Sequence, residues 1–216
     1  MPKRNVTVIS HSVLTNHRIL AQAEESFPDI AFHMTTPQLP DLVHLSANPA
    51  KQAPPPLLVQ LQAYAQVILA HPDYRARYWS VAQQFKTTHA DNVYVLEALA
   101  DEALQRHNAE GSSLAIRYLQ DAIHRGATNP PDFEELAGLL VAAKRQAEAV
   151  DVLRKGMLLA PYDAELYRLS AKVYFGLNEV KEACEVAATG EQKFPQDDEF
   201  RTLRNRCDTT SGGMNN

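Results

Sequence analysis

Two histidines near the start of the chain, His11 and His17, are the residues whose chemistry could ligate a metal ion. A neutral imidazole needs only one accessible ring nitrogen for such a bond. Their spacing does not bring both side chains to one face of a helix for a single metal ion. Spacing alone therefore predicts solvated histidines, and the six others are scattered along the chain.

Adjacent acidic residues could in principle supply a catalytic acid and base. Glu134 and Glu135, like Asp197 and Asp198, stand where a helix is expected to begin, and the helix dipole favours negative charge there. The sequence contains no nucleophile elbow, no phosphate-binding glycine loop and no HExxH zinc motif. We therefore expect a protein without enzymatic activity.

The chain contains two cysteines, Cys184 and Cys207. They lack the CxxC spacing of a metal or redox site, and two cysteines are too few for a disulfide scaffold. Free cysteine is commonly buried as a small apolar residue. We expect both to have this role on helices.

Composition limits the classes of function. The 216 residues are 45% hydrophobic and 22% charged, which is typical of a soluble protein with one domain or a short solenoid. A net charge of −5 without clustered Lys and Arg argues against a nucleic-acid surface. No apolar run is long enough to span a bilayer, and the first twenty or so residues lack the apolar segment of a secretory signal.

The elements that must position any site fall into two parts. Residues 1–56 are interrupted so often by proline that an irregular extension is predicted. From residue 57 onward, apolar residues recur with helical periodicity. The prolines that interrupt this part are Pro28, Pro37, Pro40, Pro49, Pro54, Pro55 and Pro56.

Within the helical part, small residues recur with a period of thirty-four residues. Alanine or glycine at such positions lets two antiparallel helices approach closely, while bulky residues fill the remaining space. A glycine- and serine-containing stretch at residues 108–113 adds about three residues and is expected to form a loop. The residues in register are Ala115, Ala149 and Ala183, then Ala122, Gly156 and Gly190, and finally Pro161 with Pro195.

This order of small, bulky and proline residues resembles the tetratricopeptide repeat (TPR). The resemblance implies an all-α, right-handed solenoid of about four helical hairpins over residues 57–208. A capping helix around Phe200 and Leu203 would close its C-terminal end, since it is apolar on one side and polar on the other. A flexible tail is expected over residues 209–216.

The TPR resemblance also implies a binding groove for a protein or peptide partner, lined by the first helix of each hairpin. Its charge would be acidic toward the second hairpin and basic toward the fourth, which suits a partner segment of mixed charge. A solvated surface of mixed charge without a ligand is the alternative. The inward-facing positions map to Glu97, Asp101, Glu134, Arg168 and Lys172.

A second resemblance concerns the N-terminus. Residues 1–4, followed by His11 and then by residues 15–19, resemble the segment after the last haem-attachment motif in multihaem c-type cytochromes that end in TPRs. It implies an accessory domain of an exported electron-transfer protein, in which His11 or His17 is an axial haem ligand. The chain has no CxxCH motif, so it would hold no haem itself. A non-enzymatic interaction module, cytoplasmic unless it belongs to such an exported parent, is the first hypothesis.

Overall fold

The computed structural model describes residues 3–5, 13–15 and 55–212, with side chains for residues 55–207, and divides the chain into two units, 1–56 and 57–216. In the first unit, strand β1 (Lys3–Asn5) pairs antiparallel with β2 (Val13–Thr15). Within the extension that is expected to be irregular, the described residues form these two three-residue strands. No proline lies between residues 3 and 27, so nothing there prevents backbone pairing.

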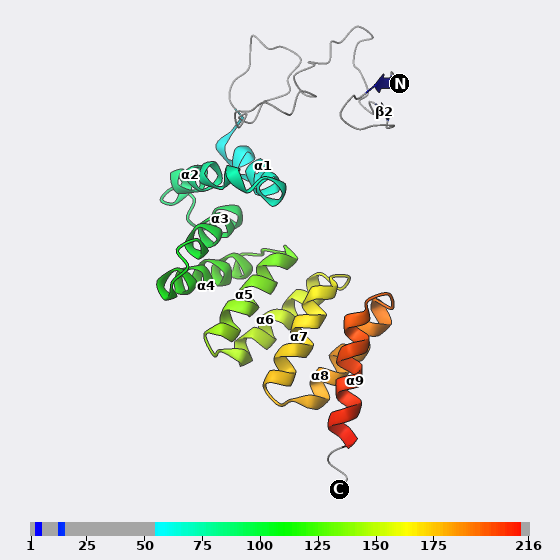
Figure 1. Cartoon of the computed structure of the whole chain (residues 1–216). Coiled ribbons are helices and arrows are strands. Elements are labelled where there is room, and N and C mark those ends of the chain that lie inside the picture. Colours follow the sequence, from blue (N-terminus) through cyan, green and yellow to red (C-terminus); the bar gives the residue numbers. More distant parts are fainter. Residues whose placement is uncertain (1–2, 6–12, 16–54, 213–216) are drawn as a thin grey trace. The chain divides into compact units, whose positions relative to one another are not determined.

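The second unit consists of helices that pair in chain order, shown in Figure 1. Helices α1 and α2, α3 and α4, α5 and α6, and α7 and α8 form four hairpins, and α9 packs on α8. The expected all-α solenoid of four hairpins with a terminal helix is thereby confirmed. The helices are α1 (Leu57–Ala70), the short 3-10 helix η3 (Pro72–Tyr74), α2 (Arg75–Phe85), α3 (Val93–Leu104), α4 (Ala109–His124), α5 (Pro130–Ala142), α6 (Gln146–Leu159), α7 (Ala164–Gly176), α8 (Val180–Lys193) and α9 (Asp198–Gly212).

Side-chain caps fix where several helices begin. Asn92 and Asp163 each accept hydrogen bonds from backbone N–H groups in the first turns of α3 and α7. Asn108 does the same for α4, where its Oδ1 accepts from the Gly111 N–H at 2.7 Å. The loop expected over residues 108–113 is therefore wrong, because this cap starts the helix at Ala109 and the glycine lies inside it.

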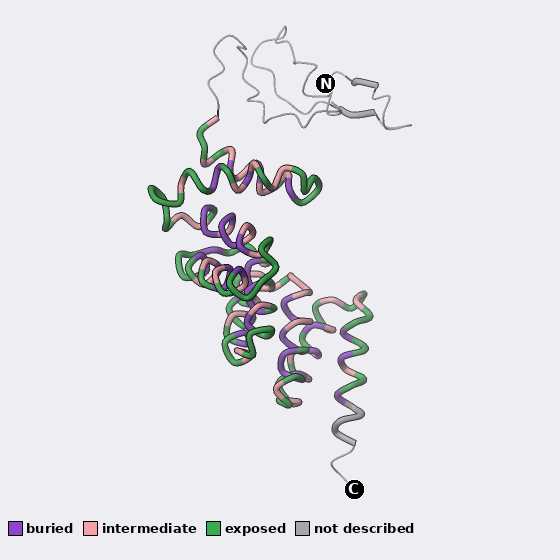
Figure 2. Tube along the Cα trace, turned by 60° about the vertical axis from the view of Figure 1, so that its left-hand side comes forward, coloured by how far each residue is buried: buried purple, intermediate pink, exposed green. Residues whose placement is uncertain are grey.

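Small residues at the helix crossings define the core, which Figure 2 shows as buried stretches on every hairpin. Ala115, Ala149 and Ala183 are all fully buried, as the repeat register predicts. At Gly190 a Cβ atom would overlap the ring of Phe200, which is itself fully buried. The small residue thus creates the space into which α9 docks.

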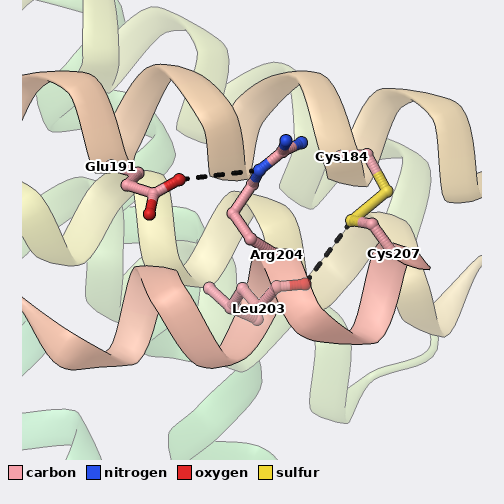
Figure 3. Close-up of a disulfide and its surroundings, with 5 residues drawn as sticks. All are labelled: Cys184, Glu191, Leu203, Arg204 and Cys207. Carbon is pink, nitrogen blue, oxygen red and sulfur yellow. Dashed lines mark hydrogen bonds and ion pairs between the residues drawn. A yellow bond between two sulfur atoms is a disulfide. The ribbon is translucent and has the colours of Figure 1, made fainter. Parts of the chain in front are cut away.

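The terminal helix is also held covalently, because Cys184 of α8 and Cys207 of α9 form a disulfide, drawn in Figure 3. The expectation of two unpaired cysteines is wrong. Docking of Phe200 beside Gly190 sets the two Cα atoms 5.8 Å apart, within the range that a disulfide requires. Helix α9 continues to Gly212, so the tail expected from residue 209 begins as helix. In the described part of the chain, every helix is too short or too polar to cross a membrane.

Candidate binding surface on the first helices

The five residues expected in the groove occupy equivalent positions on three first helices. Counted from the residues that precede α3, α5 and α7, namely Asn92, Asn129 and Asp163, the fifth position holds Glu97, Glu134 and Arg168. The ninth position holds Asp101 in α3 and Lys172 in α7, with Gly138 in α5. Residues four apart lie on one helix face. We call the surface formed by these two positions of α3, α5 and α7 the first-helix face.

At the junction of α3 and α5, Glu97 meets a carboxyl group that the repeat pattern does not predict, that of Asp132. Burial, the charge of Asp132 and a hydrogen bond between the two side chains raise the pKa of Glu97 to about 8. Burial raises the pKa of Asp132 to about 6, and the hydrogen bond from Glu97 partly opposes this rise. The pair therefore holds a shared proton near neutral pH.

The position of Asp132 belongs to the core in α3, α7 and α9. It is the third residue after Asn129, and the corresponding residues are Val95 in α3, Leu166 in α7 and Phe200 in α9, each fully buried. Asp132 is itself only 8% exposed, and its buried Oδ2 has no hydrogen-bond partner among the described residues. Sequence reasoning missed this residue. A comparison of the third position across the units would have found it, because only α5 places a charge there.

Helix α2 closes the side of this junction. The Trp79 indole N–H donates to Asp101 Oδ2 at 2.7 Å, and Arg75 Nε lies 3.6 Å from the same oxygen. Burial, followed by the charges of three nearby carboxyl groups including Glu97, raises the pKa of Tyr78. Burial and Asp101 also raise the pKa of Glu135. The junction is thus strongly acidic, and Arg75, the cation beside it among the described residues, pairs with Asp101.

At the junction of α5 and α7, Glu134 faces the first turn of α7. Burial, the charges of Asp163 and Glu165, and a hydrogen bond with Asp163 raise the pKa of Glu134 to about 7, while Arg168 opposes the rise. The residues on the two helices therefore lie within electrostatic reach across the junction.

The basic end of the first-helix face is already engaged by the C-terminal cap. Arg168 pairs with Glu165 at 2.6 Å, with Asp197 and with Glu199, and Lys172 Nζ lies 2.6 Å from Glu199 Oε1. Three carboxylates surround two cations, so the positive charge expected toward the fourth hairpin is offset. The exposed charge of this face is consequently more acidic than its own helices suggest.

The remaining candidate residues give no metal centre in the described part of the chain. Residues 55–207 contain no group of three His, Cys, Asp or Glu side chains placed to hold an ion. The hypothesised haem ligands, His11 and His17, lie outside the described residues.

The stacked hairpins, buried alanines and capping helix define the class of the fold as a TPR solenoid. Solved structures support this. YrrB, described as a TPR protein with an unusual peptide-binding site, superposes with a TM-score of 0.60 at 13% identity over 73% of this chain and 77% of its own. MamA superposes with a TM-score of 0.54 at 15% identity, over 71% of this chain and 87% of its own. The Cut9–Hcn1 complex of the APC/C superposes with a TM-score of 0.53 at 18% identity, over 71% of this chain and 29% of its own.

These identities are low, so the comparisons establish the fold alone. The sequence itself matches no protein-family model and no curated protein. The cytochrome resemblance of the N-terminal segment has no counterpart among the three relatives named above.

Proposed function

We propose that this chain is a non-enzymatic interaction module that holds an extended segment of a protein partner along the first-helix face. The observation that carries the proposal is the register of Glu97, Glu134 and Arg168. In three successive hairpins the same position on the first helix carries a charged side chain, while the residue just before it, Leu96, Phe133 or Tyr167, is buried. A row of polar positions at repeat spacing matches the repeating backbone of an extended peptide.

Two further observations agree with this role. YrrB shares the fold and is described as having a peptide-binding site. Gly138 of α5 occupies the same position on the first-helix face as Asp101 in α3 and Lys172 in α7. A Cβ atom at Gly138 would meet nothing within 4 Å. The face therefore has open space at its centre.

The disulfide favours one of the two expected locations. Disulfides persist in oxidising compartments and are rare in the cytosol. The Cys184–Cys207 bond therefore supports an exported protein, independently of any haem-containing parent. The proposed partner would then also be exported or exposed on a cell surface.

Peptide display on the full chain tests the proposed function. Selected peptides should bind the Gly138→Trp variant at least about tenfold more weakly, since the indole would fill the open space on the face. Glu182→Trp, on the exposed side of α8, is the matched control and should leave binding unchanged. Failure to select any peptide, or selection of peptides that ignore Gly138→Trp, would contradict the proposal.

A further inference from the structure

We propose that Glu97 and Asp132 form a subsite for one arginine side chain of the partner segment. The inference rests on the proposed function and deepens it, because it gives the partner a stated chemistry. It predicts a basic segment at the α3–α5 junction, instead of a segment recognised only by shape.

The argument begins with the position of Asp132. Its three counterparts are fully buried apolar residues, so an aliphatic side chain would serve the fold at least as well. A carboxyl group that is 92% buried and leaves one oxygen without a donor is costly to keep in the folded state. Such a cost is common where a buried polar group has a binding role.

The charges around the pair point to a cation. None of the ion pairs among the described residues involves Glu97 or Asp132, whereas Asp101 pairs with Arg75, and Asp197 and Glu199 pair with Arg168. A buried carboxyl group beside a half-buried one, as Asp132 is beside Glu97, is stabilised by a proton or a cation between them. The protein supplies the proton, through Glu97, and a ligand could supply the cation.

Arginine fits this pair better than other cations. A guanidinium group presents several N–H donors in a planar fork, so it can donate to two neighbouring carboxylates at once. A divalent metal ion would need further ligands, and no third His, Cys, Asp or Glu is placed to complete a metal site among residues 55–207. An acidic partner segment would be repelled, because none of the ion pairs among the described residues offsets the charge of Glu97 or Asp132.

Binding of a guanidinium would displace the proton from Glu97 to the solvent, because a cation favours the ionised carboxyl. Affinity should therefore rise between pH 6 and pH 9. Tyr78 from α2 lies within electrostatic reach of both carboxyl groups. Asp101, one turn further along α3, pairs with Arg75 from α2 and is, after burial, a cause of the raised pKa of Glu135 from α5. Arginine remains charged throughout this range, so the ligand contributes nothing to the pH dependence.

Fluorescence anisotropy tests the subsite with the full chain. The probe is a short fluorescein-labelled glycine–serine peptide carrying spaced arginines, and the control peptide has neutral citrulline in their place. The wild type should bind the arginine peptide at least about tenfold more tightly than the citrulline peptide, since charge-assisted bidentate hydrogen bonds are lost with citrulline.

Two double variants with equal changes of net charge separate a defined subsite from general attraction. Glu97→Gln with Asp132→Asn should abolish the preference for arginine. Asp121→Asn with Glu182→Gln, on exposed positions of α4 and α8, should retain it. Glu97→Gln alone serves as a second test, and thermal unfolding verifies that each variant is folded.

The subsite would be wrong if the wild type showed no preference for arginine, or if both double variants weakened binding equally. These outcomes are distinguishable from failure of the proposed function. Citrulline and arginine peptides that bind equally but are blocked by Gly138→Trp would overturn the subsite and leave the function standing. An arginine preference that depends on Glu97 and Asp132 but ignores Gly138→Trp would support the subsite and contradict the groove.

Discussion

Replacing Asp132 with leucine should stabilise this protein, although the change removes a charge from a helix that tolerates negative charge well. The equivalent residue in α7, Leu166, is fully buried, so the position accepts a leucine in the same fold. Burying a leucine contributes about 1.5–3 kcal/mol. At pH 5, below its pKa of about 6, Asp132 is largely protonated, so the change removes no charge from the first turn of α5 and the net gain should be about 1.5–3 kcal/mol.

The gain should grow as the pH rises. The folded-state pKa values of Glu97 and Asp132 lie above their usual values of 4.5 and 3.8, so the folded chain binds more protons than the unfolded chain over about pH 4–8. Stability of the wild type consequently falls as the pH rises through this window. A shift of Asp132 from 3.8 to about 6 corresponds to an additional cost of about 1–3 kcal/mol at pH 8.5, which leucine removes.

Urea unfolding followed by far-ultraviolet circular dichroism at pH 5 and pH 8.5 measures both effects. In a parallel thermal-unfolding experiment, the midpoint temperature should rise by about 2–4 °C for each kcal/mol of stability gained. Asp132→Asn keeps the size of the side chain and removes only its charge, so it should reproduce the pH-dependent part of the gain. Loss of stability in both variants at pH 8.5 would show that the carboxylate is required by the fold, and the reasoning about its burial would be refuted.

Four further variants test the packing of the solenoid and the role of the disulfide. Ala149→Leu should destabilise the chain by about 1–3 kcal/mol by overpacking a helix crossing, and unchanged urea midpoints would mean that the repeat register is wrong. Gly190→Ala should lower the thermal midpoint because its Cβ would overlap an aromatic ring of α9, whereas Gly138→Ala, in open space, should raise stability by about 0.5–1 kcal/mol. Equal effects of the two alanines would contradict the docking geometry of α9. Replacing both Cys184 and Cys207 with serine should lower the free energy of unfolding by about 2–4 kcal/mol and increase hydrogen exchange mainly in α9. A uniform loss of hydrogen-exchange protection throughout the chain would argue against a local role of the disulfide.

The sequence by itself determined the repeat and most of its core. Alanine at Ala115, Ala149 and Ala183 recurs because two helices can approach closely only where side chains are small, and this requirement is local to each hairpin. The positions of Glu97, Glu134 and Arg168 on their helices follow from the same register. A periodic sequence pattern reveals only features that recur in each repeat, and the small crossing residues and the first-helix positions both recur.

The tertiary structure decided what does not repeat. Asn92 and Asn129 are further apart in the chain than Asn129 and Asp163, and the hairpin of α3 and α4 therefore differs from the next one. Glu97 meets Asp132 across the junction of α3 and α5, and neither residue reveals this contact in its own helix. Similarly, Glu199 neutralises Lys172, and Cys184 reaches Cys207, only because α9 docks on the last hairpin. Charge partners and disulfides depend on distances between segments, and those distances are set by how whole helices pack, which a periodic pattern of residue types does not encode.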